Sequence, residues 1–152
     1  MLDTNPSTLM SKLISAYKIL PDCNLIIEIH KGILDVISYI EFKKKLSEDS
    51  DFKANMNNFI NYRKVTFNTT PDDVLKFVSF IKNSAKVLGK RKVALLTDTP
   101  NQVVTTTIYK SLQTGINQEV EIFSTTNAAL NWLTNKSIKE IEETIYKLEQ
   151  NI

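Results

Sequence analysis

Two loops of the chain carry side chains that could bind or accept a charged group. Thr69 and Thr70 precede one proline, Asp98 and Thr99 precede another, and each proline opens a segment with helical apolar spacing. The backbone N–H groups and the dipole at the start of a helix favour an anion or a phosphorylated hydroxyl. These four residues are therefore the candidate switch or interaction residues.

Thr69 and Thr70 also fit a simpler role. A Thr before Pro-Asp-Asp is an ordinary helix start, with Thr70 as the N-cap and Pro71 in the first helical position. A phosphate on Thr70 would be repelled by Asp72 and Asp73. Thr69 is therefore the better switch candidate, while Thr70 is expected to cap the helix.

Asp98 follows a short apolar strand, at the place where ligands bind in open α/β sheets. An acid there invites comparison with the phosphoacceptor of receiver domains, which needs further acids at a neighbouring strand end to hold a metal. The neighbouring predicted strand ends in His30 and Lys31 instead. The alternative is that Asp98 is a loop or capping residue.

His30 and Cys23 are the single histidine and the single cysteine of the chain. One His alone makes no metal site, and no Ser–His–Asp or Cys–His set follows from the sequence spacing. Cys23 has no basic neighbour that would activate its thiol. The three glycines are too dispersed for a phosphate-binding loop. The sequence therefore predicts no catalytic residues, no metal and no cofactor, and a protein that is not an enzyme.

Length and composition predict one globular domain, because 152 residues with 42% apolar and 24% charged side chains are enough for one core. The net charge of +2 and the scattered lysines predict no nucleic-acid partner. No apolar run approaches the roughly 18 residues that cross a bilayer, and residues 1–20 lack the apolar core of a secretory signal. With a single cysteine, the expected location is the cytosol.

Short apolar segments alternate with helical ones along the chain. Strands are predicted over residues 17–20, 25–30, 59–67, 93–96 and 119–123, and residues 33–34 are predicted to form a hairpin with 25–30 around Lys31-Gly32. Helices are predicted after Asp35, after Thr70, around Val104, and over residues 126–133 and 136–152. This alternation predicts an α/β layer fold with right-handed crossovers.

The apolar spacing also predicts which side chains face the sheet. The predicted helix after residue 35 would turn Val36, Ile37, Ile40 and the stem of Lys44 inward, with Lys43 outward. The predicted helix around residue 104 would turn Val104, Ile108 and Leu112 inward. Residues 59–67 alternate between apolar and polar side chains, which predicts a strand with one wet side near an edge of the sheet.

The order of these segments resembles a known family. A short strand, a Pro-Asp turn, LIIEIHKG and a helix beginning DVISYIEF are followed by VALLTDTPNQ and EIFSTTNAALNWL. Over residues 17–134 this order is similar to that of the small bacterial proteins described as SpoIIAA-like or STAS/SEC14-like. The resemblance implies a single α/β domain with a four- to five-stranded mixed sheet and helices mainly on one face. Residues 1–16 would be an N-terminal extension, and residues 135–152 an extra C-terminal helix.

One motif of the family is missing. Anti-sigma factor antagonists that are switched by phosphorylation carry an Asp-Ser-Ser-Gly-like turn between a main strand and the next helix. By order along the chain, the counterpart here is residues 67–71, which contain neither Ser-Ser nor Gly. The resemblance therefore implies the scaffold and does not carry over the phosphoswitch.

The C-terminal segment has the spacing of a helix–helix seam. Its apolar residues repeat at intervals of three and four: Ile138, Ile141, Ile145, Leu148 and Ile152. The first four are candidates for self-association with a second copy. The alternative is that the helix folds back onto its own domain, because two heptads alone make a marginal coiled coil.

The resemblance implies a non-catalytic regulatory or protein-interaction module with a protein partner or a homodimer, docking through residues 68–71 and 97–101. The SEC14 side of the resemblance implies an alternative, a carrier of a lipid or small apolar ligand. Nine aromatic side chains could line its pocket or simply form the core: Tyr39, Phe42, Phe52, Tyr62, Phe67, Phe77, Phe80, Tyr109 and Trp132.

Overall fold

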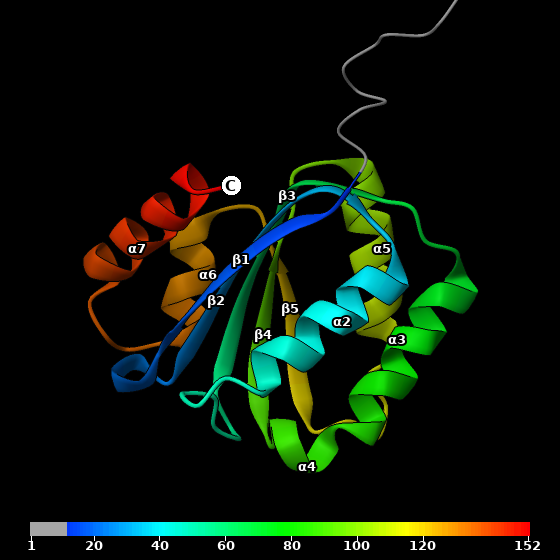
Figure 1. Ribbon diagram of the computed structural model, residues 1–152, viewed down its shortest axis with the longest axis horizontal. Helices are drawn as coiled ribbons and strands as arrows, with labels where there is room; N and C mark the ends of the chain where they lie inside the picture. The colour runs from blue at the N-terminus through cyan, green and yellow to red at the C-terminus, as the bar shows by residue number, and fades with distance from the viewer. Residues whose placement is uncertain (1–11) are drawn as a thin grey trace, which may run out of the picture.

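A five-stranded mixed sheet with its strands in chain order runs through the protein in a computed structural model, which describes residues 12–152 (Figure 1). The strands are β1 (Ile14–Leu20), β2 (Leu25–Leu34), β3 (Asn57–Phe67), β4 (Arg91–Leu96) and β5 (Gln118–Phe123). β1 is antiparallel to β2, and the other neighbours are parallel. The predicted mixed α/β sheet in a single domain is confirmed.

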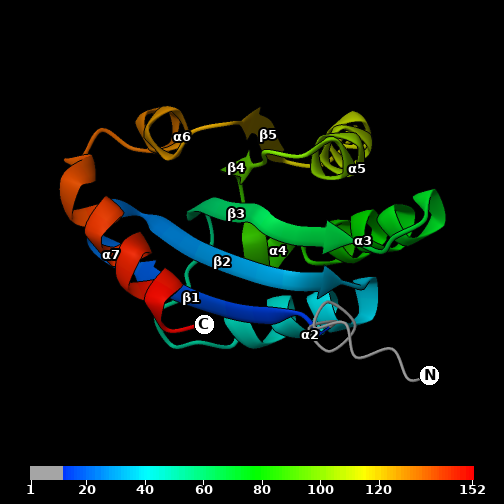
Figure 2. The same cartoon turned by 90° about the horizontal axis from the view of Figure 1, so that it is seen from above.

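Helices cover both faces of this sheet (Figure 2). One face carries α2 (Val36–Ser47), α3 (Pro71–Asn83) and α5 (Pro100–Ser111), with the short α4 (Ala85–Leu88) after α3. The other face carries α6 (Thr126–Leu133) and α7 (Ile138–Gln150). A 3₁₀ helix, η1 (Pro21–Cys23), joins β1 to β2. More helices lie on the first face, as predicted, and α6 and α7 complete a second layer.

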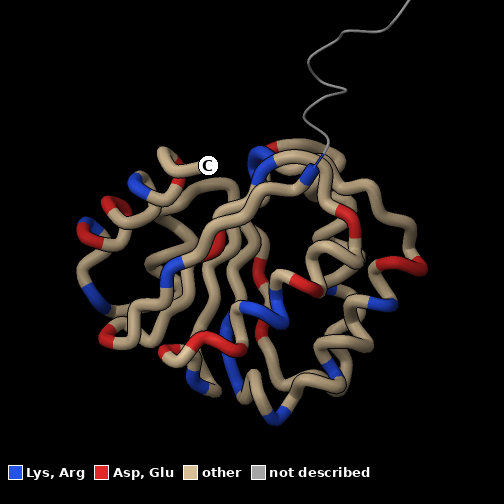
Figure 3. The backbone as a smooth tube through the Cα atoms, in the orientation of Figure 1, with Lys and Arg blue, Asp and Glu red and all other residues tan. Residues whose placement is uncertain are grey.

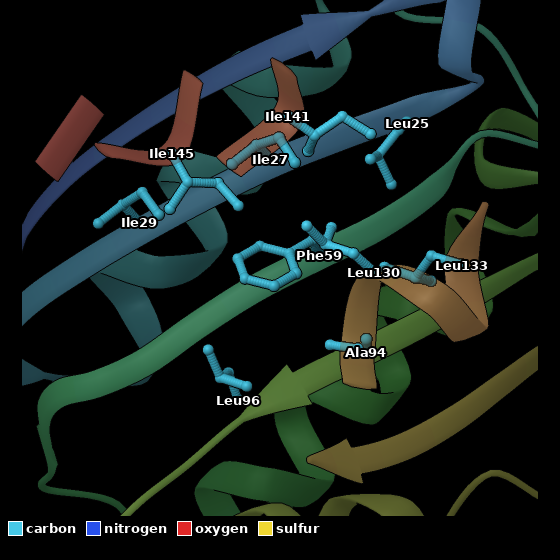
Figure 4. Packing of buried hydrophobic residues seen from close by; sticks show 11 residues of the cluster. Leu25, Ile27, Ile29, Phe59, Ala94, Leu96, Leu130, Leu133, Ile141 and Ile145 are labelled. Atoms are coloured by element: carbon cyan, nitrogen blue, oxygen red, sulfur yellow. The ribbon is translucent and has the colours of Figure 1, made fainter. Parts of the chain in front are cut away.

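The core on the α6/α7 face is apolar. Every second residue of β2 and its neighbours points there, and the buried cluster contains these residues: Leu25, Ile27, Ile29, Phe59, Ala94, Leu96, Ala129, Leu130, Leu133, Ile141 and Ile145. Figure 4 shows Ile141 and Ile145 of α7 beside Ile27 and Ile29 of β2. Branched aliphatic side chains from both layers therefore interlock in this cluster.

The C-terminal helix packs on its own chain. Ile141 and Ile145 are only 2% and 3% exposed, and Ile138 and Leu148 pack against the same cluster. α6 contacts β3, β4 and β5, whereas α7 contacts β1 and β2, so α7 covers strands that α6 does not reach. Of the two alternatives for this helix, the structure shows the fold-back. Self-association through these four side chains would require α7 to detach.

β3 is the central strand, so its predicted position near an edge is wrong. Two features explain its misleading pattern. Two of its polar side chains, Asn58 and Asn61, are buried, and β4 pairs with β3 only as far as Asn61. Beyond that point Gln102 replaces the missing strand, because its Nε2 donates to the carbonyls of Arg63 (3.1 Å) and Val65 (2.8 Å).

β2 is one continuous strand, so the predicted hairpin around Lys31-Gly32 is wrong. Its register with β3 shifts between Ile29 and Lys31, which is an irregularity within the strand rather than a turn. Gly32 has φ +97°, and a Cβ there would collide with the backbone carbonyl of Lys12. The glycine therefore permits a close approach of two chain segments rather than a reversal.

The first strand begins earlier in the chain than the predicted domain boundary at residue 17. β1 begins at Ile14, so the last residues of the predicted extension 1–16 belong to the sheet. Residues 1–11 of that extension lie outside the described residues. Between residues 12 and 152, no helix combines the length and the apolar character needed to cross a membrane.

Candidate functional site

Seven polar side chains, most of them buried, meet beneath α2. This cluster, the Glu28 network, consists of Ser15, Glu28, His30, Tyr39, Lys43, Asn58 and Tyr62. Glu28 is its centre and is 0% exposed. Its carboxylate accepts hydrogen bonds from Lys43 Nζ, from Asn58 Nδ2 (2.6 Å) and from His30 Nε2 (2.9 Å). A buried carboxylate is thus paired with a cation and further hydrogen-bonded, as burial requires.

The alternation of β2 and the turn of α2 bring these groups together. Glu28 and His30 are two residues apart, so both point to the α2 side of the sheet. On α2, the buried residues are Tyr39, Lys43 and Leu46, which share one helix face. The Glu28 network is therefore built from one strand face and one helix face that meet.

The predicted inward face of α2 is wrong. Ile37 was expected inside and is 69% exposed, whereas Lys43 was expected outside and is buried. The spacing of Val36, Ile37 and Ile40 indicated an apolar face, and the helix is instead turned toward Glu28. A buried carboxylate without a cation costs more free energy than leaving one isoleucine in water, so the ion pair decides the rotation.

Burial and pairing together set the charges of Glu28, Lys43 and His30. Burial raises the pKa of Glu28, but Lys43 and His30 outweigh that effect and hold it far below its usual value. Burial lowers the pKa of Lys43 and of His30, and Glu28 opposes both shifts. Near neutral pH the network therefore contains an ionised Glu28–Lys43 pair and a neutral His30 imidazole.

Ser15 extends the network toward the surface. Its Oγ lies 2.7 Å from His30 Nδ1, and Nε2 of the same ring lies on Glu28. With the proton on Nε2, the imidazole donates to Glu28 and accepts from the Ser15 hydroxyl, which is the order of a hydroxyl–imidazole–carboxylate relay. Burial outweighs the stabilisation that Glu28 gives to an imidazolium, so the pKa of His30 lies below its usual value. The arrangement orients the Ser15 hydroxyl toward His30.

The sequence reasoning missed this network. Ser15 and His30 are cross-strand partners in the β1–β2 register, and a Glu two residues before a His in a strand shares its face. That i, i+2 pair was the one available signal. Lys43 is 15 residues from Glu28 along the chain, and only the packing of α2 connects them.

A cavity lies between the sheet and α3. Its volume is about 50 Å³, enough for a few water molecules, and its walls are mostly apolar. The hydroxyls of Tyr39 and Tyr62 lie 2.7 Å apart in its wall, and Tyr109 and Arg91 also line it. Five of the nine aromatic residues considered as a pocket lining do line this cavity: Tyr39, Tyr62, Phe67, Phe77 and Tyr109. Trp132 instead packs against Phe123 under α6.

The predicted loop residues begin two helices. Thr70 Oγ1 accepts from the Asp73 N–H (3.1 Å), and Asp73 returns a bond to the Thr70 N–H, so the cap interpretation of Thr70 is confirmed. Thr99 forms the same reciprocal arrangement with Gln102 at the start of α5. Asp98 is exposed, and its N–H donates to Gln102 Oε1 (2.8 Å).

The structure brings the two predicted loops together at the carboxyl edge of the sheet. Asn101 Oδ1 accepts from the N–H of Phe67 (2.9 Å), and its Nδ2 donates to the carbonyl of Phe67 (3.3 Å). The start of α5 is thereby tied to the end of β3. Thr69 lies in the lining of the cavity under α3, so it is next to both the loops and the cavity.

Exposed apolar side chains gather at the beginnings of three helices. Four large ones lie within the first two turns of α2, α3 and α5: Ile37, Leu75, Val103 and Val104. These helices follow β2, β3 and β4, so they start at one edge of the parallel part of the sheet. Val104 was predicted to be buried, but the buried residues of α5 are Gln102 and Thr106. The helix is turned this way because the Gln102 side chain donates to the Val65 carbonyl on the part of β3 that β4 does not pair with.

Charge is not concentrated on any one element. Lys and Arg are spread along the chain with Asp and Glu between them (Figure 3). Among residues 12–152, no group of three His, Cys, Asp or Glu side chains is placed to hold a metal ion.

Comparison with known proteins supports the fold. No protein family matches the chain, and no curated protein matches it. A solved structure does match: an uncharacterized protein of the DUF3478 family with a SpoIIAA-like fold, from Shewanella loihica PV-4. The match has a TM-score of 0.57 and 15% sequence identity, and it covers 88% of this chain and 99% of that chain. The chain therefore has a SpoIIAA-like fold, as the sequence resemblance implied.

Proposed function

We propose that this SpoIIAA-like domain is a non-catalytic regulatory or protein-interaction module of the STAS type. Its docking site is the edge surface, defined as Ile37, Leu75, Val103, Val104 and the loops 68–71 and 97–101. The observation that carries the proposal is that large apolar side chains are exposed in the first two turns of three helices that start at one edge of the sheet. Apolar side chains at the centre of a polar rim are typical of protein-binding surfaces.

The loops of the edge surface are held for docking rather than for chemistry. Thr70 and Thr99 are used as helix caps, and Asn101 fixes the two loops to each other. A surface that is ordered before binding loses less entropy on association. The neighbouring Glu28 network supports the non-catalytic role, because its carboxylate is already neutralised by Lys43.

Affinity capture from the native cell tests this proposal. The bait is the full chain, and the test variant carries Leu75→Glu with Val104→Glu on the edge surface. The control carries Tyr146→Glu, which changes an exposed apolar residue outside that surface. We expect a stoichiometric protein partner with the wild type and the control and its loss with the test variant. A partner held equally by all three proteins would contradict the docking site.

The cavity under α3 favours a second candidate function, the binding of a small apolar ligand as in a carrier. Its walls are mostly apolar and its volume is about 50 Å³, which is too small for a lipid without movement of α3. Native mass spectrometry of gently purified protein tests it. A co-purifying small molecule supports this candidate, and an empty protein disfavours it. A single cysteine, Cys23, agrees with the proposed cytosolic setting for either function.

A further inference from the structure

Arg91 is a buried cation without an acidic partner in the described part of the chain. It begins β4, points to the α2 and α3 side of the sheet and is 6% exposed. Its Nε donates to Gln118 Oε1 (3.0 Å). Among residues 12–152, no Asp or Glu forms an ion pair with its guanidinium. An arginine keeps its proton over the whole pH range of proteins, so the charge persists.

The charges around Arg91 do not balance. Lys43 is matched by Glu28, and His30 is neutral because burial lowers its pKa. Burial raises the pKa of Tyr109, so its hydroxyl supplies no negative charge near neutral pH. The buried groups under α2 and α3 therefore carry one positive charge more than negative charges. An uncompensated buried charge is among the costliest features a fold can retain.

Two hollows meet at this cation. Lys43, Ile81 and Arg91 line both the cavity under α3 and a second hollow of about 230 Å³. The second hollow, here called the Arg91 hollow, lies between the ends of α2 and α3 and the short α4. Its apolar wall is formed by Leu46, Phe52, Phe80, Val87 and Leu88.

We propose that the Arg91 hollow binds a short- or medium-chain fatty acid, with the carboxylate on the Arg91 guanidinium and the hydrocarbon chain along the apolar wall. The guanidinium fork matches a carboxylate in two parallel hydrogen bonds, and the ligand supplies the missing negative charge. The volume of about 230 Å³ lies below the usual range of ligand pockets, which suits one short chain rather than a two-chain lipid. The inference rests on the second candidate function and adds the charge and the size of the ligand.

An NMR titration of the full chain tests the inference with octanoate and with octan-1-ol, which has a chain of the same length and no charge. The variants are Arg91→Met and, as the matched control, Arg63→Met, which changes the other arginine of the chain. We expect octanoate to shift the amide signals of the residues lining the hollow in the wild type and in Arg63→Met. Octan-1-ol, or octanoate with Arg91→Met, should bind about 10- to 100-fold more weakly, as loss of a charge-assisted hydrogen-bonded pair predicts.

Arg91→Met is expected to fold, because it removes a charge that has no acidic partner to leave behind. Far-UV circular dichroism and the dispersion of its NMR spectrum check this. Equal binding of octanoate and octan-1-ol, or of octanoate to Arg91→Met and the wild type, would overturn the anion site while leaving apolar ligand binding in place. No shift in the hollow with either probe would overturn the fatty-acid inference, and native mass spectrometry would then decide ligand binding separately.

Discussion

The two faces of the sheet are built on different principles. The cluster under α6 and α7 is aliphatic and aromatic, and α7 closes it with Ile141 and Ile145. The face under α2 and α3 buries Glu28, His30, Lys43 and Arg91, together with a cavity. The α2/α3 face also buries an apolar cluster that includes Ile60, Val93 and Leu95. The alternation of each strand therefore separates an apolar side from one on which apolar and charged groups are mixed.

The two faces also differ in what their buried groups contribute to stability. Apolar burial contributes stability in proportion to area, whereas a buried ion pair roughly offsets its own desolvation. On the charged face, Asn58 Oδ1 is buried without a hydrogen-bond partner among residues 12–152, and Arg91 has no counter-ion there. Both faces bury apolar clusters that stabilise the fold, and the α2/α3 face in addition bears the cost of buried polar and charged groups.

Removal of α7 is expected to have the largest effect. Truncation after Asn135 takes away Ile141 and Ile145 and exposes their partners on β2. The loss of two buried isoleucines predicts a fall of about 4–10 kcal/mol in the free energy of unfolding, measured by urea denaturation. Tyr146→Ala, an exposed position on the same helix, should cost less than about 0.5 kcal/mol. A stable truncated protein that has lost an oligomeric state seen by size exclusion would show instead that α7 is a seam between copies.

Breaking the Glu28–Lys43 pair is expected to have the next largest effect. Lys43→Met leaves the Glu28 carboxylate buried without its cation, which predicts a loss of about 3–5 kcal/mol in urea denaturation. Glu28→Met combined with Lys43→Met should recover most of that loss, because two apolar side chains can replace a buried pair. Lys44→Met, on the exposed side of α2, is the control and should change little. A double variant as unstable as Lys43→Met would mean that the pair itself stabilises the fold.

The same contrast explains what the sequence could predict. Strands, helix caps and the apolar α6/α7 core follow from local patterns, so β4, the Thr70 cap and the Ile141–Ile145 face were predictable. The rotation of α2 was not, because it depends on Glu28, which is distant along the chain. The central place of β3 was hidden because Gln102 of α5, and not another strand, pairs with its far end.

Helix caps on the two faces allow a finer comparison. Thr70 starts α3 with a reciprocal pair of bonds, and Thr125 starts α6 with one bond to the N–H of Ala128. Thr70→Ala and Thr125→Ala are each expected to lower the free energy of unfolding by about 1 kcal/mol, with Thr70→Ala the larger. Thr69→Ala should leave the stability unchanged, because Thr69 is not the cap. A large loss for Thr69→Ala in thermal denaturation would show that its hydroxyl has a structural role.

The smallest expected effect is a pH dependence of the free energy of unfolding that arises from His30 on the α2/α3 face. Burial lowers the pKa of His30 below its usual 6.5, even though Glu28 opposes the shift. Below about pH 6.5 the unfolded chain therefore binds a proton that the folded protein does not, so stability falls as the pH drops toward the folded pKa. Between pH 7 and pH 6 the loss should be somewhat less than about 1 kcal/mol.

His30→Gln provides the control, since it removes the titrating group and should remove this part of the pH slope in urea denaturation. Glu28 does not interfere in this window, because Lys43 and His30 hold its pKa far below its usual value despite burial, and its contribution is lost only at much lower pH. Ile141→Val, on the α6/α7 face, should lower the whole curve by about 1 kcal/mol and keep the slope. A slope that persists in His30→Gln would mean that the charged face is not what makes the fold sensitive to pH near neutrality.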